Sequence, residues 1–300
     1  MMKKVLITGA DSYIGTSFEK YVNSYYPDKL EIHTIDMRDG NWKNADFGEY
    51  DIVFHVAGIA HADIFGVSEE IRAKYYAVNT DLAIDTAGKA RAEGIKQFVF
   101  MSSIIIYGDS APVGQRKVIT RDTEPQPSNF YGDSKWQADK GVRELENDNF
   151  TVTVLRPPMI YGKGSKGNYP VLSKMAGKLP VFPDIDNERS MLYIENLCEF
   201  LAQVMIKGEG GIFWPQNEEY VRTSEMVRLI GEATGHGIKV SKIWNPAVKL
   251  ATMIPGRTRK LADKAFGSLS IDKELSEYDF KYRLYDLKTS IARTEMDHHD

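Results

Sequence analysis

The sequence contains a single cysteine, Cys198, and no apolar run that approaches the length of a membrane-spanning helix. One cysteine excludes an internal disulfide and fits a reducing compartment. The first seven residues form too short an apolar run for the core of a secretion signal, and Gly9 follows closely. We therefore expect a cytoplasmic protein with no membrane partner.

The sequence also has no excess of positively charged residues. The chain carries 38 Lys and Arg against 42 Asp and Glu, a net charge of −4. Because phosphate-backbone binding needs a concentrated basic patch, we expect no nucleic-acid partner. The 300 residues, with 42% hydrophobic and 27% charged side chains, are typical of a globular protein with a substantial core.

The N-terminal segment predicts a strand, a tight turn and a helix. The apolar strand Lys3–Thr8 leads into the turn from Gly9 to Gly15, and apolar residues then recur at helical spacing up to Pro27. Such a turn lets backbone amides and a helix N-terminus approach a pyrophosphate. Ser12 stands where the usual pattern has its middle glycine, so the approach must tolerate a small side chain. A dinucleotide site is favoured over a plain glycine-containing loop.

The next predicted strand, Leu30–Ile35, ends at Asp36, which lies 21 residues beyond Gly15. A carboxylate here can accept both ribose hydroxyls of the adenosine half and repels a 2′-phosphate, which favours NAD over NADP. Arg38 argues in the opposite direction, because a guanidinium near that ribose can accommodate the 2′-phosphate of NADP.

Two more segments, Asp51–Gly58 and Gln97–Gly108, are predicted as buried strands. Small residues at the end of the first allow a cofactor to pass close, and His55 within it is expected to pack in the core. The second delivers the hydroxyls of Ser102 and Ser103 to the edge of a parallel sheet where ligands bind.

Some polar residues have no assigned chemistry. His61 follows a predicted strand but has no visible partner. Asn79, in the helical stretch Ala73–Ala92, is either a tolerated polar position or a hydrogen-bond partner of a neighbouring strand end. His298 and His299 lie in a polar tail that is expected to fray, so we expect no metal site.

Tyr131 and Lys135 stand at the start of another helical pattern. Because they are four apart, the phenol and the ammonium lie on one helix face, one turn apart. Lowering a tyrosine pKa from 10 to near 7 takes about 4 kcal/mol, which the lysine and a cationic oxidised nicotinamide can supply together. The phenolate then accepts a proton from a hydroxyl while hydride leaves the same carbon. The alternative is an aromatic residue on a core helix beside a solvated lysine.

Together these motifs resemble the extended short-chain dehydrogenase/reductase family of nucleotide-sugar epimerases, dehydratases and reductases. The resemblance covers most of the chain and implies an α/β, Rossmann-type doubly wound parallel sheet with a smaller C-terminal substrate-binding domain. Residues 1–165 are expected to bind NAD and carry the catalytic residues, and 166–300 mainly to bind substrate, with some segments returning to the Rossmann core. The motifs are Thr8-Gly9-x-x-Ser12-x-x-Gly15, Asp36, Ser102-Ser103, Tyr107-Gly108, Tyr131-x-x-x-Lys135 and Leu155–Gly162.

The resemblance also implies roles for individual residues. Ser103 is expected to hydrogen-bond the reacting hydroxyl or ketone, Tyr131 to shuttle the proton, and Lys135 to hold the ribose and lower the pKa of the tyrosine. The cofactor is expected to contact both Tyr131 and Lys135, together with Gly9, Ser12, Tyr13, Ile14, Gly15, Asp36, Met37, Ala57, Gly58, Asn79, Ser102 and Pro157.

Asn168, Arg189 and Arg257 are expected to bind the diphosphate of the substrate. The resemblance suggests all three, and a guanidinium pairs well with phosphate oxygens. The alternative for each is a solvated surface residue. Arg257 lies in Pro255–Lys260, which is predicted to be a basic turn.

The dehydratase branch of the family places an Asp-Glu pair where this chain has Ile104-Ile105, and isoleucine cannot act as acid or base. We therefore expect an NAD-dependent UDP-sugar 4-epimerase that works through a 4-keto sugar. The alternatives are an NAD(P)-dependent 4-keto nucleotide-sugar reductase, an NADP-dependent reductase of small carbonyl compounds, and a non-catalytic dinucleotide sensor. A homodimer is expected through the Tyr131 helix, whose Trp136, Val142 and Leu145 form an apolar stripe.

Overall fold

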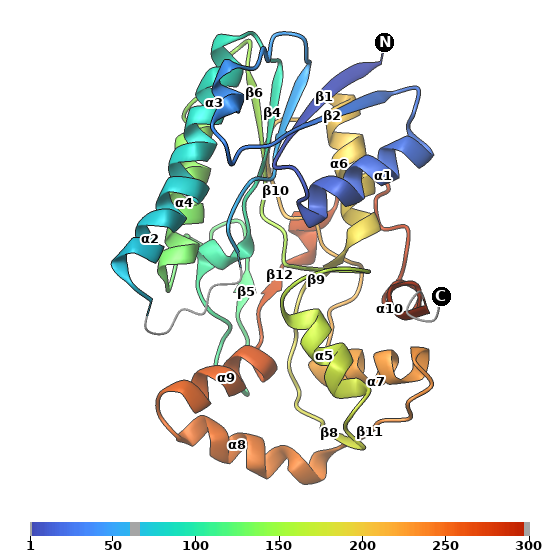
Figure 1. Ribbon diagram of the computed structural model, residues 1–300. Coiled ribbons are helices and arrows are strands. Elements are labelled where there is room, and N and C mark those ends of the chain that lie inside the picture. The colour runs from blue at the N-terminus through green and yellow to red at the C-terminus, as the bar shows by residue number, and fades with distance from the viewer. Residues whose placement is uncertain (1, 61–66, 297–300) are drawn as a thin grey trace.

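A computed structural model describes residues 2–60 and 67–296, so His61, His298 and His299 lie outside the described residues. Six parallel strands form the central sheet (Figure 1). They are β1 (Lys3–Thr8), β2 (Leu30–Ile35), β3 (Ile52–His55), β4 (Gln97–Met101), β6 (Thr151–Leu155) and β10 (Gly211–Phe213). Their order is β10-β6-β4-β3-β1-β2, so the chain winds outward in both directions from β1. This confirms the Rossmann-type doubly wound sheet.

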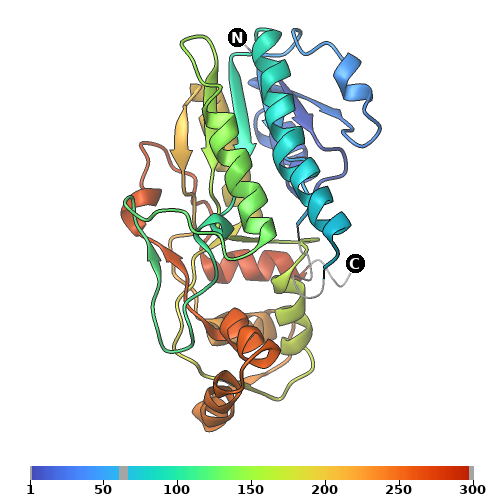
Figure 2. The ribbon, with the colours of Figure 1, turned by 90° about the vertical axis from the view of Figure 1, so that its left-hand side faces the viewer.

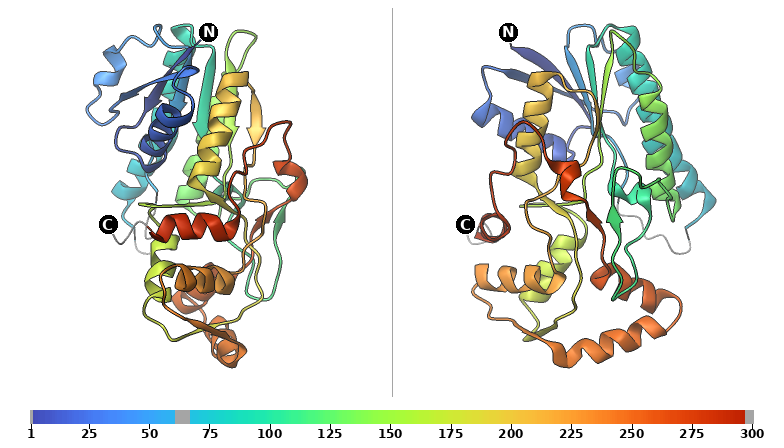
Figure 3. Two further views of the ribbon diagram at one scale, coloured as in Figure 1. Left: turned by 90° about the vertical axis from the view of Figure 1, so that its right-hand side faces the viewer. Right: turned by 180° about the vertical axis from the view of Figure 1, so that it is seen from behind.

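Helices cover both faces of the sheet. On one face lie α3 (Leu82–Ala92) and α4 (Phe130–Arg143), side by side in Figure 2. On the other face lie α1 (Tyr13–Tyr25) and α6 (Ile194–Lys207) (Figure 3). In β1, Val5 and Ile7 pack into the core under α1 and α6, whereas Leu6 packs into the core under α3 and α4. Burial on both faces explains why the central strands are apolar throughout.

The predicted strand Gln97–Gly108 is too long. β4 ends at Met101, and the apolar residues that follow form a 3₁₀ turn, Ile104–Tyr107. The strand ends there because Ser103 caps the turn, its Oγ accepting a hydrogen bond from the backbone N of Ile105 at 3.3 Å. The two serines therefore lie just beyond the strand rather than within it.

The predicted helical stretch Ala73–Ala92 consists of three parts. It comprises α2 (Glu69–Tyr76), a π-helical turn at Ala77–Asp81 and α3. Turns of this kind are rare and occur frequently at functional sites. The π turn contains Asn79, one of the expected cofactor residues.

Below the carboxyl ends of the central strands lie the remaining helices and several short strand pairs (Figure 1). β10 and α6 belong to the Rossmann part although they follow residue 166, and the division at 165/166 stays a prediction. The other elements are β5 (Val118–Ile119), β7 (Met159–Tyr161), α5 (Asn168–Ala176), β8 (Val181–Pro183), β9 (Met191–Tyr193), α7 (Thr223–Ala233), β11 (Lys239–Ser241), α8 (Asn245–Met253), α9 (Arg257–Phe266), β12 (Ser270–Ile271) and α10 (Leu287–Glu295).

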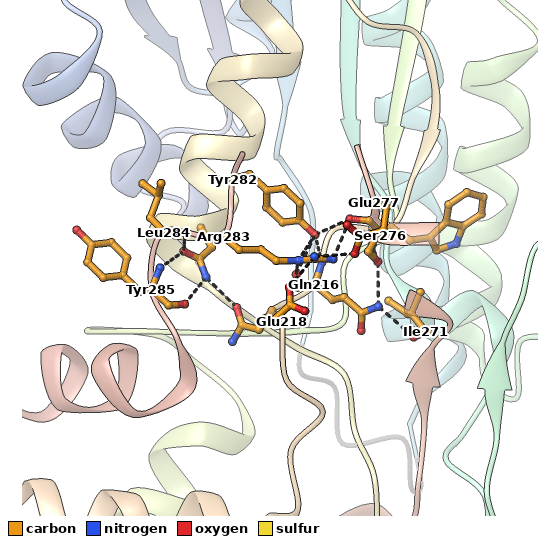
Figure 4. A network of polar contacts seen from close by, with 12 residues as sticks. Gln216, Glu218, Ile271, Ser276, Glu277, Tyr282, Arg283, Leu284 and Tyr285 are labelled. Atoms are coloured by element: carbon orange, nitrogen blue, oxygen red, sulfur yellow. Dashed lines mark hydrogen bonds and ion pairs between the residues drawn. The ribbon is translucent and has the colours of Figure 1, made fainter. Parts of the chain in front are cut away.

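A buried polar network joins the last third of the chain to the central sheet (Figure 4). Gln216, which follows β10, is fully buried and donates from Nε2 to the Ile271 carbonyl at 3.0 Å and to Ser276 Oγ at 2.9 Å. Its own carbonyl accepts from the Tyr282 hydroxyl at 2.9 Å and from Arg283 Nε at 3.2 Å. Because these partners are distant in sequence, the network fixes the C-terminal segment against the Rossmann part.

The apolar stripe on α4 packs inside this chain. Val142 is fully buried in the core beneath α3 and α4, and Leu145 packs against the same core. Trp136 packs against a third apolar cluster that includes Trp214. The stripe therefore gives no support to a dimer, and the homodimer stays a prediction.

Candidate active site

The ends of β1 and β3 approach each other closely at the carboxyl edge of the sheet. Gly9 follows β1 with φ of +119°, and a Cβ at this position would lie 2.9 Å from the backbone N of Ala57, which follows β3. Only glycine fits this conformation and this gap. Ser12 caps α1, its Oγ accepting from the backbone N of Gly15 at 3.2 Å. The serine in place of the middle glycine therefore serves as a helix cap.

Two buried hydroxyls at this edge lack hydrogen-bond partners within the described ranges. They are Ser102 Oγ, directly after β4, and the phenol oxygen of Tyr13 in the first turn of α1. Buried polar atoms are nearly always paired, so the unpaired Ser102 hydroxyl after β4 fits a ligand with hydrogen-bonding groups. The phenol oxygen of Tyr13 lies against Gly162, where a Cβ would be 2.8 Å from it. The glycine turn and the Ser102 hydroxyl thus fit a dinucleotide. Ile14 is half-buried beside Tyr13.

Asp36 at the end of β2 is held by Arg38. The guanidinium Nε lies 2.9 Å from each carboxylate oxygen, and the backbone N of Arg38 donates to Oδ1 at 2.9 Å. These hydrogen bonds from Arg38 lower the pKa of Asp36 to about 2. A ribose that binds here has to share the carboxylate with Arg38. Met37 between them is buried in the core.

The first turn of α4 packs directly on the 3₁₀ turn that Ser103 caps. A Cβ on Gly132 would lie 2.9 Å from the carbonyl oxygen of Ile105, so only glycine permits this approach. Asn129 caps the helix, its Oδ1 accepting from the backbone N of Gly132 at 3.0 Å. Tyr131, next to Gly132, is thereby brought beside the segment of Ser103.

Burial makes the phenol of Tyr131 a weaker acid than a free tyrosine. It raises the pKa to about 12, with a smaller contribution from Tyr75, whose ring packs edge-on with centroids 6.0 Å apart. Within the described ranges, no hydrogen bond joins the phenol to Ser103 or Lys135. Lowering this pKa to near 7 takes about 7 kcal/mol, so the value of about 4 expected from the sequence is too small. The difference has to come from the bound ligands.

Lys135 is buried, with only 7% of its surface exposed, so the alternative of a solvated lysine is wrong. Its ammonium donates to the carbonyl of Met101, the last residue of β4, and lies 4.4 Å from the centroid of the Phe100 ring. Burial lowers its pKa to about 8, while the nearby charge of Asp139 opposes this shift. Lys135 therefore brings a cation to the strand end that Ser102 and Ser103 follow.

Asn79 links the segment after β3 to the catalytic helix. Its Oδ1 accepts from the backbone N of Ile59 at 2.8 Å, and its Nδ2 donates to the Ile59 carbonyl and to Ser134 Oγ, both at 3.1 Å. Thr80 donates to the carbonyl of Ser134 at 2.7 Å. The predicted hydrogen bond to a neighbouring strand end is confirmed, and the alternative of a merely tolerated polar position is wrong. Contact of Asn79 with the cofactor stays a prediction. Gly58 lies beside Asn79, and a Cβ there would meet the Asn79 Oδ1 at 3.2 Å.

His55 packs in the core, as predicted. It is fully buried, its Nδ1 lies 2.8 Å from Thr8 Oγ1, and its ring stacks on Phe98. Burial, together with the charge of Lys135, lowers its pKa to about 3. The ring is therefore neutral and belongs to the support of the site.

A buried ion pair beside Lys135 was not foreseen from the sequence. Asp139 Oδ2 accepts from Arg156 Nε at 2.9 Å and its Oδ1 from Arg156 Nη2 at 2.8 Å, and both side chains are almost fully buried. Arg156 Nη1 also donates to the hydroxyl of Tyr107 at 2.7 Å. The pair joins α4 to the end of β6. The signal in the sequence was the four-residue spacing from Lys135 to Asp139, which puts both on one helix face.

Pro157 and the three expected substrate residues lie on different parts of the structure. The carbonyl of Pro157 accepts from the backbone N of Ile104 at 3.1 Å and ties the end of β6 to the 3₁₀ turn. Asn168 is the first residue of α5. Arg189 donates from Nη1 to the Lys264 carbonyl at 2.6 Å and from Nη2 to Ser110 Oγ at 3.0 Å.

Arg257 is exposed and begins α9, so the predicted turn at Pro255–Lys260 is helical from this residue on. Arg257 stands seven positions before Lys264, whose carbonyl accepts from Arg189, so the two places on α9 are about 10 Å apart along the helix axis. Diphosphate contacts of these residues and of Asn168 stay predictions.

The chain is similar to known enzymes over most of its length. The model of the NAD dependent epimerase/dehydratase family matches residues 5–213. The chain is 28% identical to a UDP-glucose 4-epimerase of Vibrio cholerae, over 91% of this chain and 88% of that protein. It is 29% identical to the N-acetyl-alpha-D-glucosaminyl-diphospho-ditrans,octacis-undecaprenol 4-epimerase of Escherichia coli O157:H7, over 67% of this chain and 62% of that protein.

The fold is similar to that of solved structures. A UDP-glucuronic acid 4-epimerase from Bacillus cereus, solved in complex with NAD, superposes with a TM-score of 0.70 at 14% identity, covering 98% of this chain and 96% of the other. This likeness supports the Rossmann-type fold. The family match spans more than half of the chain and includes the glycine turn and the Tyr131 helix. The chain therefore belongs to the NAD dependent epimerase/dehydratase family and is an enzyme that uses NAD.

Proposed function

We propose that the protein is a nucleotide-sugar 4-epimerase that acts on a UDP-sugar. The observation that carries this proposal is the packing of α4 on the 3₁₀ turn through Gly132, which holds the helix of Tyr131 against the segment of Ser103 while the buried ammonium of Lys135 reaches the end of β4. A phenol, a hydroxyl and an ammonium are the groups that oxidation of a hydroxyl to a ketone, and its reversal, require at one place.

Bound NAD would supply the acceptor, and in the reverse step the donor, of the hydride at the sugar C4. Tyr131 accepts the proton of the C4 hydroxyl and gives it back in the reverse step. Ser103 donates a hydrogen bond to the same oxygen, and Lys135 supplies positive charge that favours the phenolate. Because burial alone raises the pKa of Tyr131 to about 12, the site becomes basic only when cationic groups gather beside the phenol.

Elimination of water is not part of the proposal. Ile104, which stands at the first position of the dehydratase acid pair, is buried in an apolar cluster with Ile106 and Trp214. Its neighbour Ile105 packs against the same cluster. Neither side chain can donate or accept a proton, so this segment supports oxidation and reduction of the sugar without dehydration.

The relatives support this choice among family activities. The two relatives described above are named 4-epimerases, one for UDP-glucose and the other for a sugar carried on a diphospho-undecaprenol. The substrates in both names join a sugar to a diphosphate. A sugar diphosphate is thus the substrate class that we propose, with a uridine nucleotide as the carrier.

The proposal is tested by incubating the protein with catalytic NAD and UDP-galactose or UDP-N-acetylglucosamine, and following the sugar epimers by NMR and the nicotinamide by absorbance. We expect epimer formation without net accumulation of reduced cofactor. Tyr131→Phe is expected to slow the reaction by roughly 10²–10⁴-fold. The matched control is Tyr75→Phe, which removes the hydroxyl of the neighbouring ring.

Other results of these assays would identify one of the alternative functions. Stoichiometric consumption of reduced cofactor with a 4-keto sugar, and no epimer, identifies a reductase. Reduction of small carbonyl compounds with NADPH, without UDP binding, identifies the third possibility. Cofactor binding without turnover of any of these substrates overturns the enzymatic proposal in favour of a sensor.

A further inference from the structure

α8 and α9 form the end of the molecule farthest from the central sheet (Figure 1). This end is unusually rich in exposed apolar side chains. Among the described residues, thirteen large apolar side chains are exposed, and six of them lie within residues 242–264. They are Ile243, Trp244, Leu250, Met253, Ile254 and Leu261.

The apolar residues of α8 form two faces with different surroundings. Val248 and Ala251 face α9, where they line a shared groove with Ala262 and Phe266. The other face carries Leu250 and Met253, which are 62% and 77% exposed and lie on one helix face because they are three apart. Ile243, in the 3₁₀ turn Lys242–Trp244 just before α8, is 80% exposed. These three side chains make up an apolar stripe that the fold of the described residues leaves uncovered.

Positive charge is concentrated in the segment that contains this stripe. Residues 242–264 include six Lys and Arg and one acidic residue, Asp263, although the whole chain has a net charge of −4. Asp263 accepts from the backbone N of Val113 at 3.0 Å and pairs with Arg259 at 3.6 Å. Lys249 on α8 is next to Leu250 in sequence, and Lys242 is next to Ile243 in the 3₁₀ turn before α8. On α9, positions 257, 260 and 264 share one face and carry Arg, Lys and Lys.

We propose that the α8–α9 hairpin, residues 242–266, docks on the surface of a membrane that contains anionic lipids. An apolar stripe with lysines along its border is the pattern of helices that lie in the membrane interface. Each Lys or Arg near an anionic surface strengthens binding by about fivefold. No helix of the described residues is long and apolar enough to cross a membrane, and a hairpin that lies on the surface needs none.

The charge of the hairpin and its apolar stripe argue against two other binding partners, a second copy of this chain and nucleic acid. A second copy packed symmetrically on this face would bring two strongly cationic hairpins together, and like charges oppose such an interface. Nucleic acid would use the cations but leave the aliphatic stripe in water. The expectation of no membrane partner follows from the lack of a membrane-spanning segment, but a hairpin that lies on the membrane surface does not need one. The expectation of no nucleic-acid partner follows from the net charge of the whole chain, which does not describe the charge of one hairpin.

The test is flotation of the full chain with phosphatidylcholine vesicles that contain roughly three-tenths phosphatidylglycerol, and with pure phosphatidylcholine vesicles. We expect binding to the anionic vesicles that weakens with salt. Lys242→Gln with Lys249→Gln is expected to lower the partition coefficient by about 25-fold, from two factors of about five. Leu250→Asp with Met253→Asp is expected to abolish binding.

The matched controls are Lys20→Gln with Lys29→Gln, and Ile71→Asp, which change exposed residues on the Rossmann part. The proposal is overturned if the wild type does not float with anionic vesicles or if a control loses binding to the same extent. It is also overturned if sedimentation shows a dimer that Leu250→Asp with Met253→Asp dissociates, which would make this face a protein interface. None of these readouts requires turnover, so failure of the epimerase assay leaves this proposal unaffected.

Discussion

Replacing Lys135 by methionine is expected to make the protein more stable while it destroys activity. Burial lowers the pKa of Lys135 from 10.5 to about 8, so near pH 7 the folded state holds a cation that it disfavours by about 3 kcal/mol. Methionine keeps the stem but loses the hydrogen bond to the Met101 carbonyl, worth about 1 kcal/mol. The variant should therefore gain about 2 kcal/mol.

The gain should depend on pH in a defined direction. Below about pH 8, both the folded and the unfolded wild type carry the proton, and the full penalty applies. Between about pH 8 and 10.5 the folded state loses the proton while the unfolded state keeps it, so the wild type recovers stability. The advantage of the variant should fall to about 1 kcal/mol near pH 9 and vanish by about pH 10.

Urea unfolding at several pH values measures this difference, with Lys140→Met as the control. Lys140 is exposed on the same helix, so its replacement should change the free energy of unfolding by about 0.5 kcal/mol or less. The reasoning is refuted if Lys135→Met destabilises the protein at pH 7, or if its advantage grows with rising pH. Either result would mean that the buried ammonium stabilises the fold rather than serving the chemistry.

Three further substitutions test the geometry of the site. Gly9→Ala is expected to abolish NAD binding in calorimetric titration, because its Cβ would lie 2.9 Å from backbone after β3; retained affinity would contradict this. Gly132→Ala is expected to lower kcat by about 100-fold, because it pushes α4 off the 3₁₀ turn; unchanged kcat would contradict the close packing. Asp139→Asn should lower the free energy of unfolding by about 3–5 kcal/mol, since Arg156 stays buried without its carboxylate. Arg156→Met should cost less in the same urea curves, because Arg143 still pairs with Asp139 at 3.0 Å; the reverse order would refute this.

The sequence predicted the elements whose signals are local. β1 and β2 begin and end where their apolar runs do, and α4 begins at the start of the helical pattern of Tyr131. Apolar runs mark buried parallel strands, and helical spacing of apolar residues marks helices. The sheet and the Tyr131 helix could therefore be predicted from short stretches of sequence.

The sequence did not show features that depend on tertiary contacts or on a change of conformation within an apolar run. The end of β4 was missed because Ile104 and its neighbours continue the apolar pattern while the backbone turns. The pair of Asp139 and Arg156 joins α4 to β6 and has no local signal for its partner. Arg257 looked like part of a turn because Pro255 precedes it, yet it begins a helix.

The pKa of the site also depends on burial, which sequence spacing does not give. The four-residue spacing of Tyr131 and Lys135 puts the phenol and the ammonium on one helix face, but it does not show that the ammonium donates to the Met101 carbonyl or that the phenol is buried against Tyr75. Both shifts disfavour the charged form, so the protein alone resists the reactive state of each group.

The most direct test of the central claim is the titration of the Tyr131 phenol, measured as the phenolate absorbance of the wild type minus that of Tyr131→Phe. Without cofactor, the midpoint should lie near the pKa of about 12 that burial imposes. With saturating oxidised NAD, it should fall toward neutrality, a change of about 7 kcal/mol in the free energy of ionisation. A midpoint that NAD leaves near 12 would contradict the assignment of Tyr131 as the base.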